Sequence, residues 1–202
     1  MADVAPTGAP DASPEPSDAA PPERPTLHGC AVAESLGQTV VHPTREQYLP
    51  LLRAVLDEGY DQCLDVFGVD YLVHPGRTLP EGIAPERFEV VLLLINHQER
   101  TRLRVRVQVP EAEPVLPSLF ELWPGTEAPE RETYDMFGIV FEGNRDLRRI
   151  YMPPDYTSFP LRKDFYLPDD AARSPGGGVR HVEAPHAPIA ATDSVVRRTV
   201  KA

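Results

Sequence analysis

Two neighbouring stretches, FEVVLLLI (Phe88–Ile95) and RLRVRVQV (Arg102–Val109), decide the fold. Beyond Glu89 the first stretch is apolar on both faces, which is typical of a strand in the middle of a covered sheet. The second alternates strictly between polar and apolar side chains, so it predicts a half-exposed strand with its arginines and Gln108 toward solvent. The polar residues 96–100 between them suit a hairpin, and we expect the two strands to pair antiparallel.

Towards the N-terminus, the pattern predicts a helix followed by a strand. Thr44 and Gln47 resemble a capping box, and an apolar stripe continues to Gly59, which can end the helix. Pro50 either kinks this helix or marks the first turn of a helix that begins later. The apolar run Cys63–Tyr71 predicts a strand that also belongs to the sheet.

Towards the C-terminus, prolines divide the chain into short elements. Ser118–Trp123 offers at most a short helix. Glu130–Phe137 predicts another, with Pro129 tolerated as its first residue and Gly138 just past its end. Ile139–Phe141 and Leu147–Met152 then predict short strands. This order of elements predicts an α+β domain whose largely antiparallel sheet is covered by helices on one face.

Composition divides the chain of 202 residues into three parts. Residues 1–25 form an Ala/Pro/acidic tail without the large apolar side chains that ordering requires, so we expect disorder there. Residues 174–202 begin with a Ser-Pro-Gly-Gly-Gly run and predict a flexible tail. The predicted domain is 26–173.

Charge and hydropathy exclude several classes of partner. The net charge of −11 disfavours nucleic acid and anionic lipid, which bind clustered Lys and Arg. The longest apolar run, Val90–Ile95, is far too short for a membrane helix, so direct membrane insertion is not expected. The N-terminus lacks the basic and apolar regions of a secretory signal, which predicts a cytoplasmic protein.

No cofactor or metal site is predicted. Cys30 and Cys63 are too far apart for a Cys-x-x-Cys pair, and the six histidines are scattered. We interpret Cys30 as a thiol beside the disordered tail and Cys63 as a buried strand thiol. The chain also has no glycine-rich nucleotide loop and no recognisable nucleophile elbow.

Two polar clusters remain as candidates for chemistry. The first contains Glu130, Arg131, Glu132 and Asp135. Its carboxylates could act as an acid and a base, but the interleaved charges better suit an ion network in which Arg131 pairs with Asp135, four residues away.

The second cluster contains Arg148, Arg149, Arg162 and Lys163. Its four cations could hold a phosphate, line a solvated face or contact an acidic neighbour. No glycine-rich loop accompanies them that would favour the phosphate.

Six segments together closely resemble one known family: Val69–Leu72, Pro85–Val91, Leu116–Leu119, Glu130–Gly143, Asp146–Ile150 and Pro160–Phe165. That family is the 30 kDa subunit, also called the C subunit, of proton-pumping NADH:quinone oxidoreductase (respiratory complex I). The resemblance spans roughly Tyr48–Leu167, and its densest part is residues 130–165. It also implies an extended C-terminal arm that starts at Leu161–Asp164 and follows the partner. The motif and interface residues that it implies are Glu130, Arg131, Glu132, Tyr134, Asp135, Phe137, Gly138, Phe141, Arg148, Arg149, Pro160, Leu161, Arg162, Lys163 and Asp164.

The resemblance implies an accessory subunit on the cytoplasmic side of the membrane that binds no cofactor itself and has no activity alone. Its partners would be the large quinone-site (49 kDa-like) subunit and the small subunit with the terminal iron–sulfur cluster. The whole complex would use FMN, iron–sulfur clusters, NADH and quinone. Two alternatives stay open: a homologous subunit of a membrane-bound hydrogenase or other quinone-linked dehydrogenase, and a stand-alone acid/base enzyme.

Overall fold

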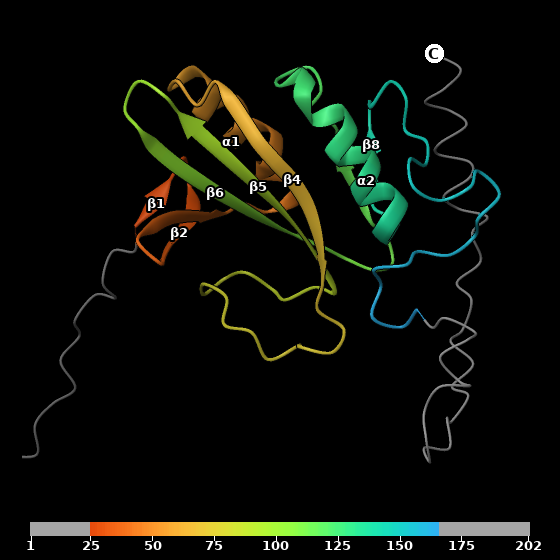
Figure 1. Cartoon of the computed structure of the whole chain (residues 1–202). Helices are drawn as coiled ribbons and strands as arrows, with labels where there is room; N and C mark the ends of the chain where they lie inside the picture. Colours follow the sequence, from red (N-terminus) through yellow and green to blue (C-terminus); the bar gives the residue numbers. More distant parts are fainter. Residues whose placement is uncertain (1–24, 166–202) are drawn as a thin grey trace, which may run out of the picture.

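A six-stranded sheet forms the centre of the structure, a computed structural model that describes residues 25–165 (Figure 1). Its strand order is β1-β2-β3-β6-β5-β4, and every neighbouring pair is antiparallel except β3 and β6. The strands are β1 (Thr26–Leu27), β2 (Cys30–Ser35), β3 (Gln38–His42), β4 (Gln62–Asp70), β5 (Phe88–Asn96) and β6 (Thr101–Val109). The predicted tails, apart from Pro25, lie outside the described residues, as does the end of the predicted arm.

The hairpin of β5 and β6 is confirmed. Val90 lies opposite Val107 and Leu92 lies opposite Val105, so one face of the hairpin is a continuous apolar surface. These side chains are fully buried in the main core. The predicted strand Cys63–Tyr71 is also confirmed: it corresponds to β4, which pairs with the other edge of β5.

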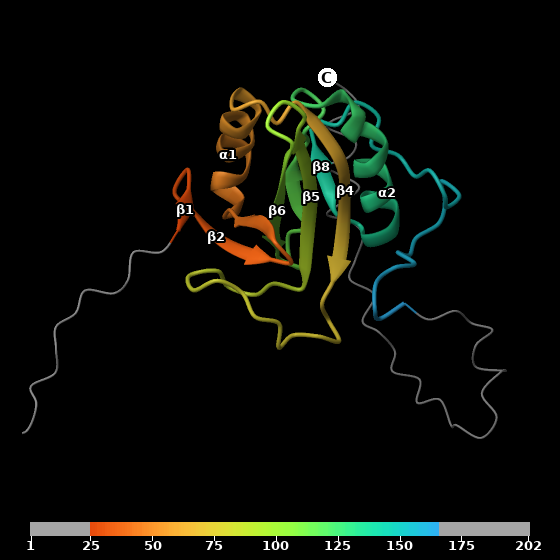
Figure 2. The same cartoon turned by 60° about the vertical axis from the view of Figure 1, so that its left-hand side comes forward.

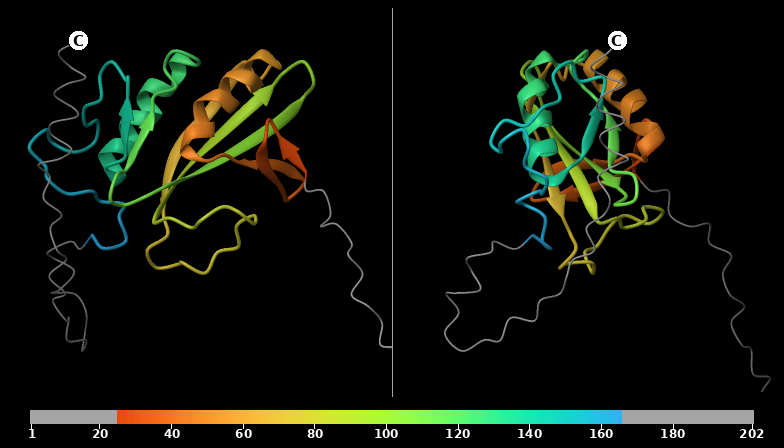
Figure 3. Two further views of the ribbon diagram at one scale, coloured as in Figure 1. Left: turned by 180° about the vertical axis from the view of Figure 1, so that it is seen from behind. Right: turned by 90° about the vertical axis from the view of Figure 1, so that its right-hand side faces the viewer.

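Both helices cover the same face of the sheet, as predicted. Residues of both helices share one hydrophobic core with the inward side chains of β4, β5 and β6, and Figures 2 and 3 show the two helices in further views. α1 (Arg45–Asp57) begins with the predicted capping box, in which Thr44 and Gln47 cap each other's backbone. The helix continues through Pro50, so the later start that we considered is wrong. It buries Tyr48 and a leucine pair, Leu51 and Leu52, against the sheet.

The N-terminal strands β1 to β3 were not predicted. Their short runs of small and polar residues do not show a clear alternation, but they extend the sheet through the parallel pairing of β3 with β6. The interpretation of Cys30 is wrong as a result. Its side chain lies in β2 with only 1% exposure and packs in the core, whereas Cys63 in β4 is half-buried.

The region after the hairpin is built around a second helix and a small parallel sheet. β7 (Val115–Pro117) pairs with β8 (Val140–Glu142). Ser118–Trp123 forms turns rather than a helix, and a single 3-10 turn, η1 (Pro124–Thr126), follows it. α2 (Glu127–Phe137) begins earlier than predicted, so Pro129 is its third residue and still lies in the first turn.

The predicted strand Leu147–Met152 is wrong, because this segment has no regular secondary structure. The α2 helix packs on β4, where the Thr133 hydroxyl donates a hydrogen bond to the Val66 carbonyl at 3.4 Å. Neither described helix is long and apolar enough to cross a bilayer.

Gly138 and Gly143 test how closely the segment after α2 packs on the end of that helix, because a Cβ would be crowded at one position and not at the other. Both have a left-handed backbone, but a Cβ at Gly138 would lie 2.7 Å from Arg162 and from the Phe159 ring, whereas one at Gly143 would meet nothing closer than 3.9 Å. We expect Gly143→Ala to lower the free energy of unfolding by about 1–2 kcal/mol through backbone strain, and Gly138→Ala to lower it further. Urea unfolding of the full chain measures both. Gly76→Ala, which has open space, is the control, and equal effects at Gly138 and Gly143 would contradict the close packing.

Candidate functional site

Asp135 on α2 has a fully buried carboxylate that organises the chain segment after β8. Its Oδ2 accepts backbone N–H groups from Ile150 at 3.0 Å, Tyr151 at 2.7 Å and Met152 at 3.0 Å, and its Oδ1 accepts from the Arg149 guanidinium at 2.7 Å. These N–H groups cannot also serve a strand ladder, which explains why the predicted strand does not form.

The pKa of Asp135 follows from this arrangement. Burial by itself raises it, but the hydrogen bonds from Met152, Arg149, Tyr151 and Ile150 outweigh burial and hold the pKa below its usual range. The carboxylate is therefore charged at neutral pH and acts as a fixed acceptor rather than as a proton donor.

Glu130 is the second fully buried carboxylate of α2, and it connects different segments. It accepts hydrogen bonds from the Leu119 backbone at 2.7 Å, the Ser118 hydroxyl at 2.7 Å and the Asn144 amide at 2.9 Å. No ion pair compensates this charge within residues 25–165. Burial therefore dominates and raises the pKa, although the hydrogen bonds oppose it.

The predicted pairing of Arg131 with Asp135 is wrong. Arg131 lies 3.6 Å from the Asp146 carboxylate and donates to the Arg148 carbonyl at 3.2 Å. Asp135 pairs instead with Arg149, whose guanidinium is 2.7 Å away. The exposed Glu132 accepts only a long contact from the Tyr151 hydroxyl, at 3.4 Å.

The four cations of the second cluster do not form one site. Arg149 is almost fully buried against Asp135, whereas Arg148 is 74% exposed and pairs with Asp146. Arg162 donates to the Phe137 carbonyl at 2.7 Å, and Lys163 contributes its backbone N–H to Asp70 at 2.9 Å. A phosphate site made from all four is therefore not formed.

Arg162 is held inside the protein. Its guanidinium lies 4.5 Å from the Phe159 ring and 5.0 Å from the Phe88 ring, measured to the ring centroids. Burial, and next the nearby Arg87, lower its pKa. Together with the Leu161 N–H, which donates to the Met136 carbonyl at 3.2 Å, this contact fastens residues 159–162 across the end of α2.

A third centre joins three of the resembling segments. Arg87 donates to the buried carboxylate of Asp70 at 2.9 Å and to Asp164 at 2.8 Å, and it also contacts Glu111. Burial alone raises the pKa of Asp70, but the bonds from Arg87, Lys163 and Leu72 lower it overall. Segments that are far apart in the sequence thus meet at one ion network.

The other motif residues are structural in their placement. Phe141 is fully buried, and Phe137 packs so closely on β4 that a Cβ at Gly68 would lie 2.8 Å from its ring. Tyr134 packs partly buried against the core, and Pro160 is half-buried. Gly138 ends α2 with a left-handed backbone, as predicted.

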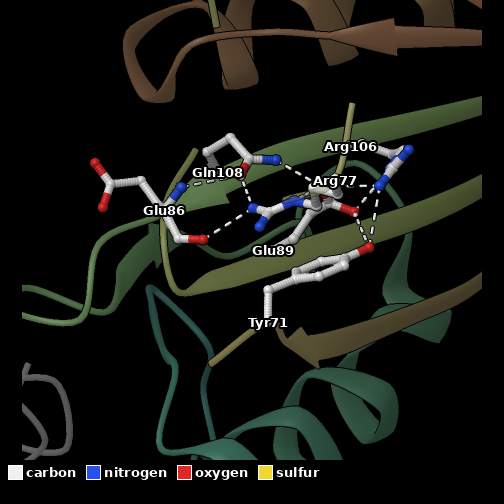
Figure 4. A network of polar contacts seen from close by, with 6 residues as sticks. All are labelled: Tyr71, Arg77, Glu86, Glu89, Arg106 and Gln108. Atoms are coloured by element: carbon white, nitrogen blue, oxygen red, sulfur yellow. Dashed lines mark hydrogen bonds and ion pairs between the residues drawn. The ribbon is translucent and has the colours of Figure 1, made fainter. Parts of the chain in front are cut away.

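A further buried network lies on the other face of the sheet and was not predicted (Figure 4). The Glu89 carboxylate has 0% exposure and accepts from Arg106 at 2.7 Å and from Gln108. Arg77 from the loop after β4 lies over the Tyr71 ring, 3.7 Å from its centroid. Arg106 and Gln108 therefore do not simply face solvent, as the alternation suggested. Glu89 was the available signal, because a lone acid in an apolar strand requires a buried partner.

Five large apolar side chains in the segments next to these centres are exposed. We call them the apolar edge: Leu72, Val73, Ile150, Tyr151 and Leu161, with exposures of 41–71%. Backbone hydrogen bonds connect four of them to the centres. Ile150 and Tyr151 donate to Asp135, Leu161 donates to the adjacent Met136, and the Leu72 N–H shares the Asp70 carboxylate with Lys163. The edge is thus held by buried polar contacts.

Two observations concern metal binding and the accessibility of the buried carboxylates. Residues 25–165 contain no group of three or more His, Cys, Asp or Glu side chains that could hold a metal ion. Glu130 and Asp135 are enclosed by donors from their own chain, and both are out of reach of a substrate.

Asp135→Asn tests the first centre. We expect a loss of about 3 kcal/mol in the free energy of unfolding at neutral pH, because Arg149 is left buried without its anion. The lowered pKa of Asp135 means that this contribution is present above the unfolded value of 3.8 and is lost as pH falls below it. Urea unfolding over pH 7 to about 3 checks this. Asp155→Asn, at an exposed site, is the control, and a pH-independent loss would contradict the assignment.

Glu130→Gln should show the opposite pH dependence. Because the pKa of Glu130 is raised, its protonation favours the folded state, fully so below the ordinary value of 4.5 and no longer above the folded pKa. We therefore expect the stability of the native chain relative to Glu130→Gln to increase as pH falls from neutral toward 4.5. The same titration of unfolding measures this. Glu132→Gln, on the exposed face of α2, is the matched control, and a decrease would show that Glu130 is not desolvated.

Comparison with known proteins confirms the family that the six segments resemble. Residues 41–171 match the family model described as the respiratory-chain NADH dehydrogenase 30 kDa subunit. The C subunit of the NADH-quinone oxidoreductase of Bordetella pertussis is 40% identical over 145 residues, which cover 68% of this chain and 70% of that protein. Subunit 5 of the Thermus thermophilus enzyme is 40% identical over 137 residues, covering 65% and 63%.

Two solved structures have the same fold. The trypsin-resistant fragment (1-134) of Nqo5 superposes with a TM-score of 0.53 at 37% identity, over 59% of this chain and 90% of the fragment. A chain of the archaeal membrane-bound sulfane sulfur reductase superposes with a TM-score of 0.57 at 21% identity, over 78% and 89%, and this likeness concerns the fold alone. The segments that meet around α2 and Arg87 all fall within the matched residues, and the chain belongs to the family of the 30 kDa subunit of respiratory-chain NADH dehydrogenase.

Proposed function

We propose that this chain is a non-catalytic, accessory subunit of an NADH:quinone oxidoreductase and that it binds the other subunits through the apolar edge. The observation that supports this most directly is the apolar edge itself. Its side chains are exposed, yet the backbone N–H groups of Leu72, Ile150 and Tyr151 donate to carboxylates that are buried. A pre-ordered apolar surface loses little conformational entropy on binding, which is the property that a scaffold requires.

The proposed partners are the large quinone-site (49 kDa-like) subunit and the small subunit with the terminal iron–sulfur cluster. In this proposal FMN, the clusters, NADH and quinone are bound by other subunits, and the chain lies on the cytoplasmic side of the membrane. Leu161 and Tyr151 are the central contacts, because they are 48% and 61% exposed and their backbone N–H groups bond to Met136 and Asp135 at the end of α2. Lys163 is exposed and supplies a cation two residues after Leu161.

A homologous subunit of a hydrogenase or of another quinone-linked dehydrogenase is the second candidate. The fold shared with a chain of the sulfane sulfur reductase shows that this architecture also occurs in a different respiratory membrane complex. The relatives at about 40% identity favour the NADH-linked function. A stand-alone acid/base enzyme is disfavoured, because Glu130 and Asp135 are enclosed and occupied by internal hydrogen bonds.

The double variant Tyr151→Ser/Leu161→Ser tests the apolar edge. The tagged full-length chain is purified from detergent-solubilised native membranes, and the co-purifying proteins are identified and quantified. Removing two large side chains from an interface should weaken retention of the partners by at least about 10-fold, since each buried side chain contributes roughly 1.5–3 kcal/mol. Unfolding of the isolated variant should be unchanged, because both side chains face outward.

Leu36→Ser is the matched control, because Leu36 is 95% exposed in the turn between β2 and β3, away from the apolar edge. Unchanged retention in the double variant would show that the apolar edge is not the interface. The identity of the partners tests the function separately. A nicotinamide-binding flavoprotein among them supports the NADH-linked complex, whereas a large subunit with nickel ligands would replace it with the hydrogenase candidate.

A further inference from the structure

The outer face of the sheet, opposite the two helices, is more apolar than a solvated face should be. Val91, Leu93 and Ile95 of β5 point to this face, since they alternate with the buried core residues of the same strand. Phe67 on β4 lies directly opposite Val91 and is 37% exposed. A strand that is apolar on both faces is typical of a sheet covered on both sides.

Residues 25–165 cover only one end of this face. Near the start of β5, Tyr71 and Arg77 from the loop lie over Glu89 and Gln108 and complete the network of Figure 4. Near the other end, a shallow pocket of about 140 Å³ remains between the strands. We call it the outer pocket, and its floor and rim include Leu64, Leu93, Gln38, Arg102 and Arg104.

The charges at the outer pocket are unbalanced. Arg104 donates to a neutral group, the Gln38 amide oxygen, at 2.8 Å. Arg102 is exposed. Neither arginine forms an ion pair with a carboxylate anywhere in residues 25–165, whereas the next residue on the same face, Arg106, is paired with Glu89. An apolar pocket beside two uncompensated cations is complementary to apolar side chains flanked by carboxylates.

The remaining parts of the chain do not have this chemistry. Residues 1–24 contain five acids, but they have no Leu, Ile, Phe, Tyr or Trp to fill a leucine-lined pocket. Residues 166–202 contain five Arg or Lys against four Asp or Glu, which is the wrong sign of charge. A second copy whose two-fold axis passed through the pocket would place the arginine pair opposite itself, and like charges across an interface oppose association.

We propose that the outer pocket binds an acidic, amphipathic segment of another protein, with a large apolar side chain against Leu93 and with carboxylates at Arg102 and Arg104. The pocket lies on the face opposite the helices. Its occupant can therefore be identified independently of the partner at the apolar edge and of the proposed function.

Site-specific photo-crosslinking tests this. Phe67 is replaced by p-benzoylphenylalanine in the tagged full-length chain, and native membranes that contain it are illuminated. The crosslinked peptides are then sequenced by mass spectrometry. We expect one major product, joined to a peptide of a different protein that contains a large apolar residue with Asp or Glu within a few positions.

Charge reversal supplies the second part of the test. Arg102→Glu should lower the yield of this product by about 10-fold, which corresponds to roughly 1.4 kcal/mol. Arg53→Glu is the matched control, because Arg53 is an exposed arginine on α1, on the other face of the sheet, and the yield should not change. Arg102 is exposed and without an ion pair in the described structure, so its reversal leaves the unfolding transition of the isolated chain in place.

Four results would overturn the proposal. These are a crosslink to residues 1–24 or 166–202 of the same chain, a crosslink to a second copy, a crosslink to a peptide without acidic residues, and a yield that does not respond to Arg102→Glu. The absence of any product in assembled membranes would overturn it as well, because it would show that Phe67 faces only solvent there.

Discussion

A carboxylate removed from water must be surrounded by donors, and much of the C-terminal half of this protein is arranged to satisfy Asp135. Three successive backbone N–H groups and the Arg149 guanidinium converge on it. This requirement turns residues 149–152 away from a regular strand and directs the following chain across the end of α2. There the close approach of Phe159 and Arg162 tolerates only a glycine at 138. One side chain thus determines the path of the segment that carries much of the exposed apolar surface.

Two further buried carboxylates, Asp70 and Glu130, are also surrounded by hydrogen-bond donors, but the charges of their donors differ. Asp70 has an arginine partner, Arg87, and accepts from the Lys163 backbone, and the same arginine also binds Asp164. Glu130 has only neutral donors and joins α2 to the turns on either side of it. Replacing buried ion pairs with apolar residues often costs a protein no stability, so the value of these centres lies in defining position. They hold apolar side chains at the surface in a defined geometry, which suits a family whose relatives are subunits of a larger enzyme.

The sequence predicts the elements that have a strong local signal. The hairpin of β5 and β6, the capping box at Thr44 and the end of α2 at Gly138 are confirmed, because periodicity and capping depend on near neighbours. The failures have non-local causes. The partner of Asp135 is Arg149 rather than Arg131, since the chain returns to the helix from 14 residues away. The sequences of β1 to β3 show only weak strand patterns. They form strands by pairing with one another and, through β3, with the edge of β6. Of the candidate site, the motif residues were identified, but their grouping into three buried centres required the tertiary structure.

The parallel pairing of β3 with β6 has a consequence for how the protein folds. It brings Thr39 next to Leu103, some 64 residues later in the chain, whereas the hairpin of β5 and β6 joins residues that are close in sequence. The entropy of closing the longer loop is recovered only when its contacts form, so the short-range hairpin should assemble first. During synthesis, β2 and β3 emerge early and can pair with each other, but β3 cannot join the rest of the sheet until β6 has left the ribosome. Until then the buried side of β2, with the Cys30 thiol, is open to oxidants and to chaperones.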